Sequence, residues 1–304
     1  MSSCDISYTA PAGLDQETLD LLDQTLADTE ALVADEMKLQ EDWNALQEAL
    51  ASLDGQDDTA LVSICMSIMP LVAQVLDDAM FCMVDAWNIS SDCTNLLISA
   101  QNDYNAMVDG VDNDSYSAAE GAADAESFME TLNLFTTTEF TITITNNDGQ
   151  KSTATSTGLL DLLTKSTDEA DDEWVKLGGG NGEAPMSTQT ADTIALSMDD
   201  IENTIGEEYF ADPEKYGSTV YAEITEWVAP TDTPEGDNAE VAPEIDQINS
   251  DFDQSTSALA TASQSQQAQI QNLNNEQQEF YSLWSDMNDS LTAQMTYMVQ
   301  NQLS

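Results

Sequence analysis

The sequence predicts a mainly α-helical protein with a small α+β insert, in which long N- and C-terminal coiled-coil helices pack as a hairpin or bundle. Apolar residues recur three and four apart over the last sixty residues, and no Gly or Pro follows Pro243. Leucines recur every seven residues from Leu32 to Leu53. A central stretch alternates Thr with apolar residues, as half-buried strands do. The chain therefore divides into a flexible N-terminus (1–13), a helical region (14–110), a central, surface-exposed α+β insert (111–242) and a C-terminal coiled-coil helix (243–304).

The first helix is predicted to begin after Asp15, a residue type that caps helix N-termini, and to end near Leu53, before Asp54-Gly55. Its acidic residues have one oppositely charged neighbour, Lys38, so an apolar stripe must hold it in place. The expected interface residues of this helix are Leu32, Leu39, Leu46 and Leu53, with Leu22, Trp43 and Leu50 in a companion seam.

A more apolar helix is predicted from Thr59 to about Leu76, a stretch of eighteen residues without a charged side chain. That length is at the lower limit for crossing a bilayer. Pro70, Gln74 and the lack of basic flanking residues favour a helix buried within an assembly over a membrane span. The helical pattern resumes at Met80 and ends near Gly110. The interface residues expected on the apolar helix are Ile64, Ile68, Leu71 and Val75.

The central insert is predicted to contain a β-hairpin. Residues 138–145 read as a strand, Asn146 to Gly149 as a turn and residues 150–157 as the returning strand. A third strand is expected at 218–228. Short helices are expected at 159–163, 169–177 and 191–205. The glycine-rich run 178–182 lacks the Lys of a phosphate loop and reads as a linker.

The C-terminal helix, from Ile245 to Leu303, would be about 90 Å long if it were uninterrupted, and a helix of that length needs a partner. Gln266, Gln269 and Gln277 weaken its apolar seam, and no Lys or Arg follows Lys215. Polar amides and bulky aromatic side chains must therefore set its register. The expected interface residues are Ile270, Leu273, Phe280, Trp284, Met287, Leu291 and Met298.

The net charge of −53 arises from 58 acidic residues against five lysines, with neither Arg nor His. Nucleic-acid binding is not expected, because neutralising phosphates requires Lys or Arg. Without His there is no Ser-His-Asp or Cys-His pair and no His-ligated zinc. Pairs of carboxylates are abundant, but nothing marks one pair as a hydrolase site, so we expect no enzyme. No cofactor is expected beyond weak divalent cations or salt that screen the charge, and the Asp-rich composition is typical of a halophilic source.

The four cysteines, Cys4, Cys65, Cys82 and Cys93, show no CxxC spacing. Three of them lie in one apolar region, where free cysteine usually behaves as a small buried hydrophobe. A disulfide is the alternative. The N-terminus has neither a basic start nor an apolar stretch, so a cleaved secretory signal is not expected.

Two stretches resemble the type III secretion needle-tip and translocator filament proteins. One is the Asn/Gln/Ser-rich run from Ile248-Asn249-Ser250-Asp251 to Ser265-Gln266-Gln267-Ala268-Gln269-Ile270-Gln271-Asn272-Leu273-Asn274, and the other is the apolar segment Leu61 to Val84. The resemblance implies a secreted subunit without a cleaved signal, kept unpolymerised by a secretion chaperone, that extends a needle outside the cell. The heptad helix before the apolar segment, the larger insert and the lack of Arg depart from that family.

The function expected from the sequence is a structural subunit of an extracellular filament or secretion-needle extension, which assembles with itself through its terminal helices. A membrane-active translocator is one alternative, with residues 59–76 in the bilayer. A surface or viral structural protein of a halophilic organism is another. An acidic nucleic-acid mimic is less favoured, because its surface would carry charge where this chain carries apolar heptads.

Overall fold

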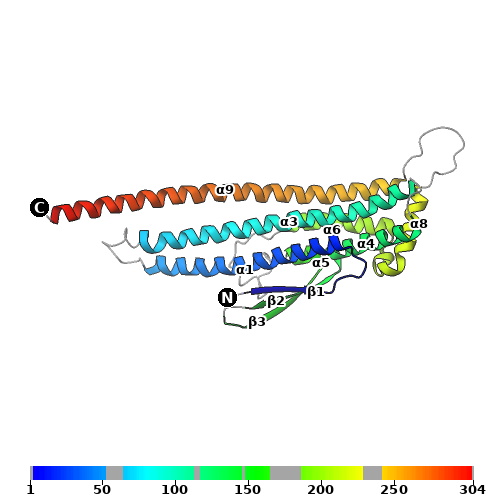
Figure 1. Cartoon of the computed structure of the whole chain (residues 1–304), viewed down its shortest axis with the longest axis horizontal. Helices are drawn as coiled ribbons and strands as arrows, with labels where there is room; N and C mark the ends of the chain where they lie inside the picture. Colours follow the sequence, from blue (N-terminus) through cyan, green and yellow to red (C-terminus); the bar gives the residue numbers. More distant parts are fainter. Residues whose placement is uncertain are drawn as a thin grey trace, which may run out of the picture.

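A computed structural model describes residues 3–52, 64–112, 117–145, 148–164, 186–228 and 242–302 (Figure 1). Of these residues 84% are helical, and the described strands form one small antiparallel sheet, which confirms the predicted fold class. The described elements, in chain order, are β1 (Ser3–Tyr8), α1 (Gln16–Ser52), the π-helix η1 (Ile64–Ile68), α3 (Met69–Asp112), α4 (Ala118–Thr136), β2 (Glu139–Thr145), β3 (Lys151–Thr157), α5 (Gly158–Thr164), α6 (Thr188–Ile205), α7 (Glu207–Phe210), α8 (Pro213–Val228) and α9 (Pro243–Gln302).

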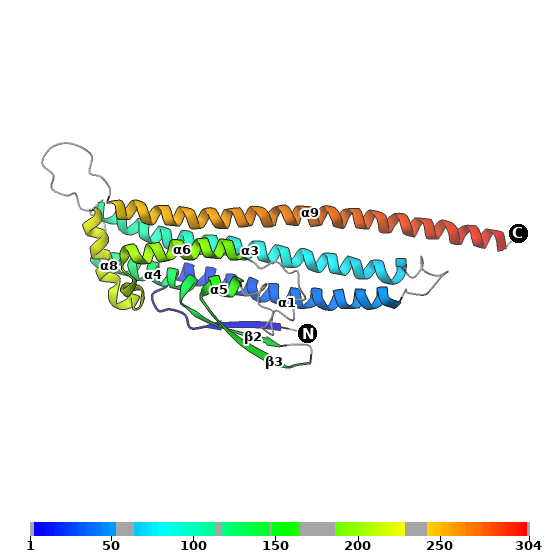
Figure 2. The ribbon, with the colours of Figure 1, turned by 180° about the vertical axis from the view of Figure 1, so that it is seen from behind.

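Helices α1, α3 and α9 form an elongated stalk, with α3 between the other two (Figures 1 and 2). Each neighbour of α3 runs antiparallel to it. The remaining helices and the sheet gather around one end of these three helices, which we call the head. The other end, the distal stalk, comprises residues 38–52, 64–85 and 264–302. There α9 extends past the described ends of α1 and α3.

Helix α1 begins as predicted, because the Asp15 carboxylate accepts a hydrogen bond from the Thr18 amide at 2.6 Å. The prediction of a companion seam is wrong for the last residues of that seam. Leu22 is fully buried, but Trp43 and Leu50 are 45% and 49% exposed. A straight α-helix drifts by about 20° per heptad relative to a strict seven-residue repeat. A face that is buried at residue 22 therefore turns toward solvent four heptads later.

Helix α3 is continuous from Met69 to Asp112, where the sequence suggested two successive helical segments. Pro70 lies in its first turn, where the missing N–H breaks no hydrogen bond inside the helix. The wider π-helical turn η1 leads into it at Ile64–Ile68. This arrangement carries the apolar segment directly into the core helix of the protein.

The prediction of a flexible N-terminus is wrong for Ser3–Tyr8, which forms β1. This strand pairs with β2 in an antiparallel register that places Ile6 opposite Ile142. The β2–β3 hairpin agrees with the prediction and pairs Glu139 with Thr157. β1 was missed because only six residues alternate and their pairing partner lies over 130 residues later.

The predicted third strand at 218–228 is also wrong, since these residues belong to α8. Its buried residues, Gly217, Val220 and Ile224, are three and four apart, which is the spacing of a helix face. Helices α5 and α6 occupy the positions expected for them. The helix expected at 169–177 and the linker at 178–182 lie outside the described residues.

The central insert was expected at the surface, and this is wrong for much of it. Phe128 of α4 packs its ring against Tyr104 of α3, Phe210 of α7 and Phe252 of α9, with ring centroids 5.8 to 6.3 Å apart. Phe128, Tyr104 and Phe252 are fully buried. Helix α4 is apolar enough to displace water from α3, so the insert completes the hydrophobic core of the head.

Candidate assembly interface

The three stalk helices bury their apolar side chains well in the head and poorly in the distal stalk. In the head, Ile89, Leu97, Ile248 and Leu259 are fully buried. In the distal stalk, fourteen large apolar side chains are only half-buried: Leu39, Ile64, Leu71, Val72, Val75, Leu76, Met80, Met83, Val84, Ile270, Leu273, Phe280, Trp284 and Met287. Three helices in one layer cannot cover both sides of their seams.

The head covers those seams with additional helices. There α4 packs on α3, and α6 packs on α9. Figure 2 shows that α4 and α6 flank only the head end of the stalk. The distal stalk therefore presents apolar seams that additional helices cover elsewhere in the same protein.

Large apolar side chains that are exposed gather at the same end of the protein. Among the described residues ten such side chains are exposed, and the distal stalk carries eight of them. They come from all three helices: Trp43, Leu50, Met66, Phe81, Tyr281, Leu283, Met295 and Tyr297. Ile98 and Leu196 are the two that lie elsewhere. Concentrations of this kind mark surfaces that bind other molecules.

Three aromatic residues of α9 form one cluster in the distal stalk. The rings of Tyr281 and Trp284 are stacked with centroids 6.3 Å apart, and Phe280 lies 6.1 Å from Trp284. The indole N–H of Trp284 is buried and has no hydrogen-bond partner among the described residues. Aromatic side chains with an unused polar group are typical of protein–protein interfaces.

Polar side chains fix the register of α9 on α3, as the sequence predicted. The Trp87 indole donates to the Ser263 hydroxyl at 2.8 Å, and the Gln266 amide donates to the Ala86 carbonyl at 3.3 Å. Farther along, the Gln277 amide donates to the Asp77 carboxylate at 2.5 Å. These bonds need specific partners, so they select one alignment of two otherwise adaptable apolar seams.

The predicted interface residues separate into three groups. Leu32, Leu46, Ile68 and Leu291 are buried within the chain and are not available to a partner. Leu39, Ile64, Leu71, Val75, Ile270, Leu273, Phe280, Trp284 and Met287 are half-buried along the stalk. Leu53 and the side chain of Met298 lie outside the described residues.

The sequence interpretation did not single out the most exposed apolar side chains, Met66 and Tyr297, at 73% and 67% exposure. It also missed Leu283. A heptad search selects residues on one seam and disregards apolar residues beside it. The signal that could have found Leu283 and Tyr297 is an excess of apolar residues off the seam of α9.

The distal part of α9 is also poor in charge. Residues 254–304 contain only four acidic residues, Glu276, Glu279, Asp286 and Asp289, in a chain that carries 58. Two copies of this surface would therefore repel one another less than two copies of any acidic helix such as α1.

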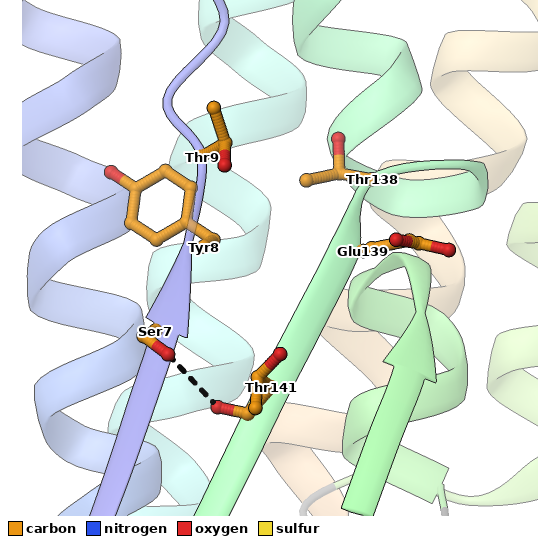
Figure 3. A pocket seen from close by; sticks show the side chains of 6 residues that line it. All are labelled: Ser7, Tyr8, Thr9, Thr138, Glu139 and Thr141. Carbon is orange, nitrogen blue, oxygen red and sulfur yellow. Dashed lines mark hydrogen bonds between the residues drawn. The ribbon is translucent and has the colours of Figure 1, made fainter.

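A hollow lies beside the sheet, where the end of β1 meets the start of β2 (Figure 3). Its volume is about 470 Å³, and it is lined by Ser7, Tyr8, Thr9, Thr138, Glu139 and Thr141. The Ser7 hydroxyl donates to the Thr141 carbonyl at 3.5 Å, and the Tyr8 hydroxyl donates to Asp23 at 3.0 Å. These internal bonds use two of the lining polar groups, and the hollow is open to solvent.

Cys4, Cys82 and Cys93 are free thiols, and the side chain of Cys65 is not described. Burial raises the pKa of Cys4 and of Cys93 to about 12, so both stay protonated at neutral pH. Within the described part of the chain, no three His, Cys, Asp or Glu side chains converge in a way that could hold a metal ion.

One described helix, Met66–Val111, is long and apolar enough to cross a membrane by length and composition. Comparison of the chain with protein-family models, with curated proteins and with solved structures finds no match. These comparisons neither support nor oppose the resemblance to needle-tip and translocator proteins.

Proposed function

We propose that this protein is a structural subunit that assembles with further copies of itself through the distal stalk, in a filament or a similar extended polymer. The observation that carries the proposal is the concentration of exposed and half-buried apolar side chains at the end of the stalk that α4 and α6 do not reach. A stalk helix of a second copy has the shape and the apolar stripe to cover these seams.

Burial of the exposed side chains supplies the driving force. Removing a Leu, Phe or Met side chain from water contributes about 1.5–3 kcal/mol. Leu283, Met295 and Tyr297 alone are 56%, 49% and 67% exposed on α9. Burying such side chains on several helices at once offsets the loss of translational and rotational freedom on association.

The acidic charge opposes association and makes it depend on salt. The Debye length shrinks from about 8 Å at physiological ionic strength to about 3 Å at 1 M salt. Assembly therefore strengthens as salt or divalent cations are added. This dependence fits a secreted or surface subunit that stays soluble until it reaches its site of assembly, as the expected needle extension or halophile surface protein would.

The test substitutes exposed residues, because their replacement leaves the folded subunit intact. Light scattering and electron microscopy should detect polymers of the wild type at high salt, and Leu283→Asp together with Tyr297→Asp should abolish them. Leu196→Asp is the matched control, since Leu196 is 63% exposed on α6 in the head. Polymers that survive the α9 substitutions, or that vanish equally with Leu196→Asp, would contradict the proposal.

The apolar helix Met66–Val111 favours a second candidate, a membrane-active component. In this alternative α3 leaves the stalk and enters a bilayer, while the acidic surface is repelled by anionic lipid. Flotation with vesicles of neutral and of anionic lipid separates the two candidates. A structural subunit remains in the soluble fraction with both lipids, and a membrane-active protein floats with neutral vesicles.

A further inference from the structure

Three pairs of aspartates bridge α1 and α3 along one flank of the stalk. Asp28, Asp35 and Asp42 follow one another at seven-residue intervals on α1, and Asp78, Asp85 and Asp92 do so on α3. Because the helices are antiparallel, the pairs are Asp28 with Asp92, Asp35 with Asp85 and Asp42 with Asp78. Carboxylates placed together in this way repel one another at neutral pH.

In two pairs the facing carboxyl groups lie close enough to act on each other. Burial and the neighbouring carboxyl group raise the pKa of Asp92, which lies beside Asp28, and of Asp42, which lies beside Asp78. Two carboxyl groups can share a hydrogen bond only if one of them is protonated, because an ionised carboxylate is an acceptor alone.

Burial points to the same requirement. Asp78 is 2% exposed, and its Oδ2 atom receives no hydrogen bond from any donor that the structure describes. One oxygen of Asp92 is in the same situation. A buried acceptor without a donor is costly, and a proton shared with the facing carboxyl group removes the cost.

Among the described residues Lys38 supplies a counter-charge to two of the three pairs. The Lys38 ammonium forms an ion pair with Asp78. The described lysines besides Lys38 are Lys151 and Lys215, which lie in β3 and α8. Burial raises the pKa of Asp35, and the charge of Lys38 opposes that rise. Among the described residues Asp28–Asp92 is therefore the pair that depends most on protons.

The surroundings of the pairs are acidic or neutral. Burial and Asp35 raise the pKa of Asp85 to about 6, and burial and Asp28 raise that of Asp92 to about 6. Burial also raises the pKa of Glu36, on α1 beside this flank, to about 7. The Glu30 carboxylate of α1 accepts a hydrogen bond from the Ile6 amide of β1. Asp5, another acidic residue, lies on the same strand. Helix α9 has no acidic residue between 254 and 275, and within this stretch Ser263 and Gln266 bond to Trp87 and Ala86 of α3.

We propose that the aspartate pairs between α1 and α3 are a proton-operated clasp, which takes up protons as the pH falls and then fastens the two helices to each other. A carboxyl group that binds its proton more tightly in the folded chain than in the unfolded chain gives the folded state more bound protons. Stability therefore increases as the pH falls and decreases as the pH rises through 6. This clasp acts within one subunit and is independent of assembly.

The experiment measures urea unfolding of the full chain at pH 5, 6, 7 and 8, at a dilution and salt concentration that keep it monomeric. The folding equilibrium constant of the wild type should rise at least about tenfold from pH 8 to pH 5, after allowance for solvent screening at partly exposed pairs. The double variant Asp85→Asn and Asp92→Asn places neutral amide donors in two pairs. Its stability at pH 8 should approach that of the wild type at pH 5, with most of the pH dependence lost.

A control with the same change in charge separates the clasp from general repulsion. Asp20→Asn with Glu48→Gln removes two charges from exposed positions on α1 and should leave the wild-type pH dependence in place. Equal flattening of the pH profile by both double variants would overturn the proposal. Carbon-13 NMR of the wild-type carboxyl groups gives a second readout that needs no variant. Titration of Asp85 and Asp92 near 4, the ordinary value for Asp, would also overturn it. So would stabilisation by calcium at pH 8 as strong as that by acid, since the pairs would then be cation sites.

Discussion

Gln277 of α9 donates a hydrogen bond to Asp77 of α3, a residue 200 positions earlier in the chain. The Tyr281 hydroxyl reaches the same carboxylate oxygen at 3.4 Å. One carboxylate thus receives two donors from α9 and fixes the alignment of the distal stalk, where apolar packing is loosest.

Asp77→Ala should destabilise the stalk by about 1–2 kcal/mol, because hydrogen bonds to a charged acceptor are stronger than neutral ones and this site is partly open to water. Urea unfolding followed by circular dichroism measures the change. Gln278→Ala is the control, because Gln278 is exposed and its amide bonds to Asn274 within α9. Equal effects of the two substitutions would show that the link between α3 and α9 adds nothing.

A double-mutant cycle tests the second link between the same helices. Trp87→Phe keeps an aromatic ring and removes the indole donor, and Ser263→Ala removes its acceptor. We expect a coupling energy of about 0.5–1.5 kcal/mol between the two changes in the unfolding free energy. If the effects of the two substitutions on the unfolding free energy were strictly additive, the hydrogen bond between Trp87 and Ser263 would not contribute to holding α9 on α3.

Gly158 joins β3 to α5 with a φ of 79°, and a Cβ atom there would lie 2.2 Å from the Phe135 carbonyl oxygen. Gly149, in the hairpin turn, has a φ of 77° and nothing within 4 Å of a Cβ atom. Both glycines adopt a left-handed conformation, which costs about 1–2 kcal/mol for other residues. Gly149→Ala should cost about that much, and Gly158→Ala should cost distinctly more, because its Cβ meets the backbone of α4. Similar midpoints of thermal unfolding would contradict this reasoning.

The raised pKa values of the half-buried Cys4 and the buried Cys93 should protect both thiols from alkylation. A pKa of about 12 for Cys4 lowers its thiolate fraction at pH 8 by about three orders of magnitude relative to an ordinary cysteine. Iodoacetamide should therefore label Cys4 and Cys93 slowly in the native chain and rapidly in urea, with mass spectrometry of peptides to identify each site. Rapid native labelling of either residue would mean that the head opens at that position.

The long helices and the hairpin were predictable, because their patterns are local. Apolar spacing of three and four specifies α9 over sixty residues, and alternating Thr and Ile specify β2. The strand β1 and the buried role of α4 were not predictable, since they depend on partners distant in sequence. At 218–228, Val220, Tyr221 and Trp227 are strand-favouring residue types, yet the helical spacing of Val220 and Ile224 decided the outcome.

The sequence predicted which part of α9 carries the candidate interface, but not which of its side chains are exposed. The heptad pattern identified Phe280 and Trp284, which the stalk half-buries, and missed Leu283, which it leaves exposed. A sequence gives the faces of a helix relative to one another, but the identity of the covered face depends on where neighbouring helices end. In this chain α4 and α6 end near the middle of the stalk, and no local pattern encodes that limit.

The seven-residue spacing of the aspartates has a consequence for misfolding. If α1 slipped by one heptad along α3, Asp28 would face Asp85 and Asp35 would face Asp78, so most of the aspartate pairs would form again. The pairs hold the helices without distinguishing these two alignments. The ion pair of Lys38 with Asp78 does distinguish them, because the slip moves Lys38 by about 10 Å, at about 1.5 Å per residue. Lys38 therefore adds to the contacts that select the native alignment, together with the bond between the Thr18 and Ser99 hydroxyl groups.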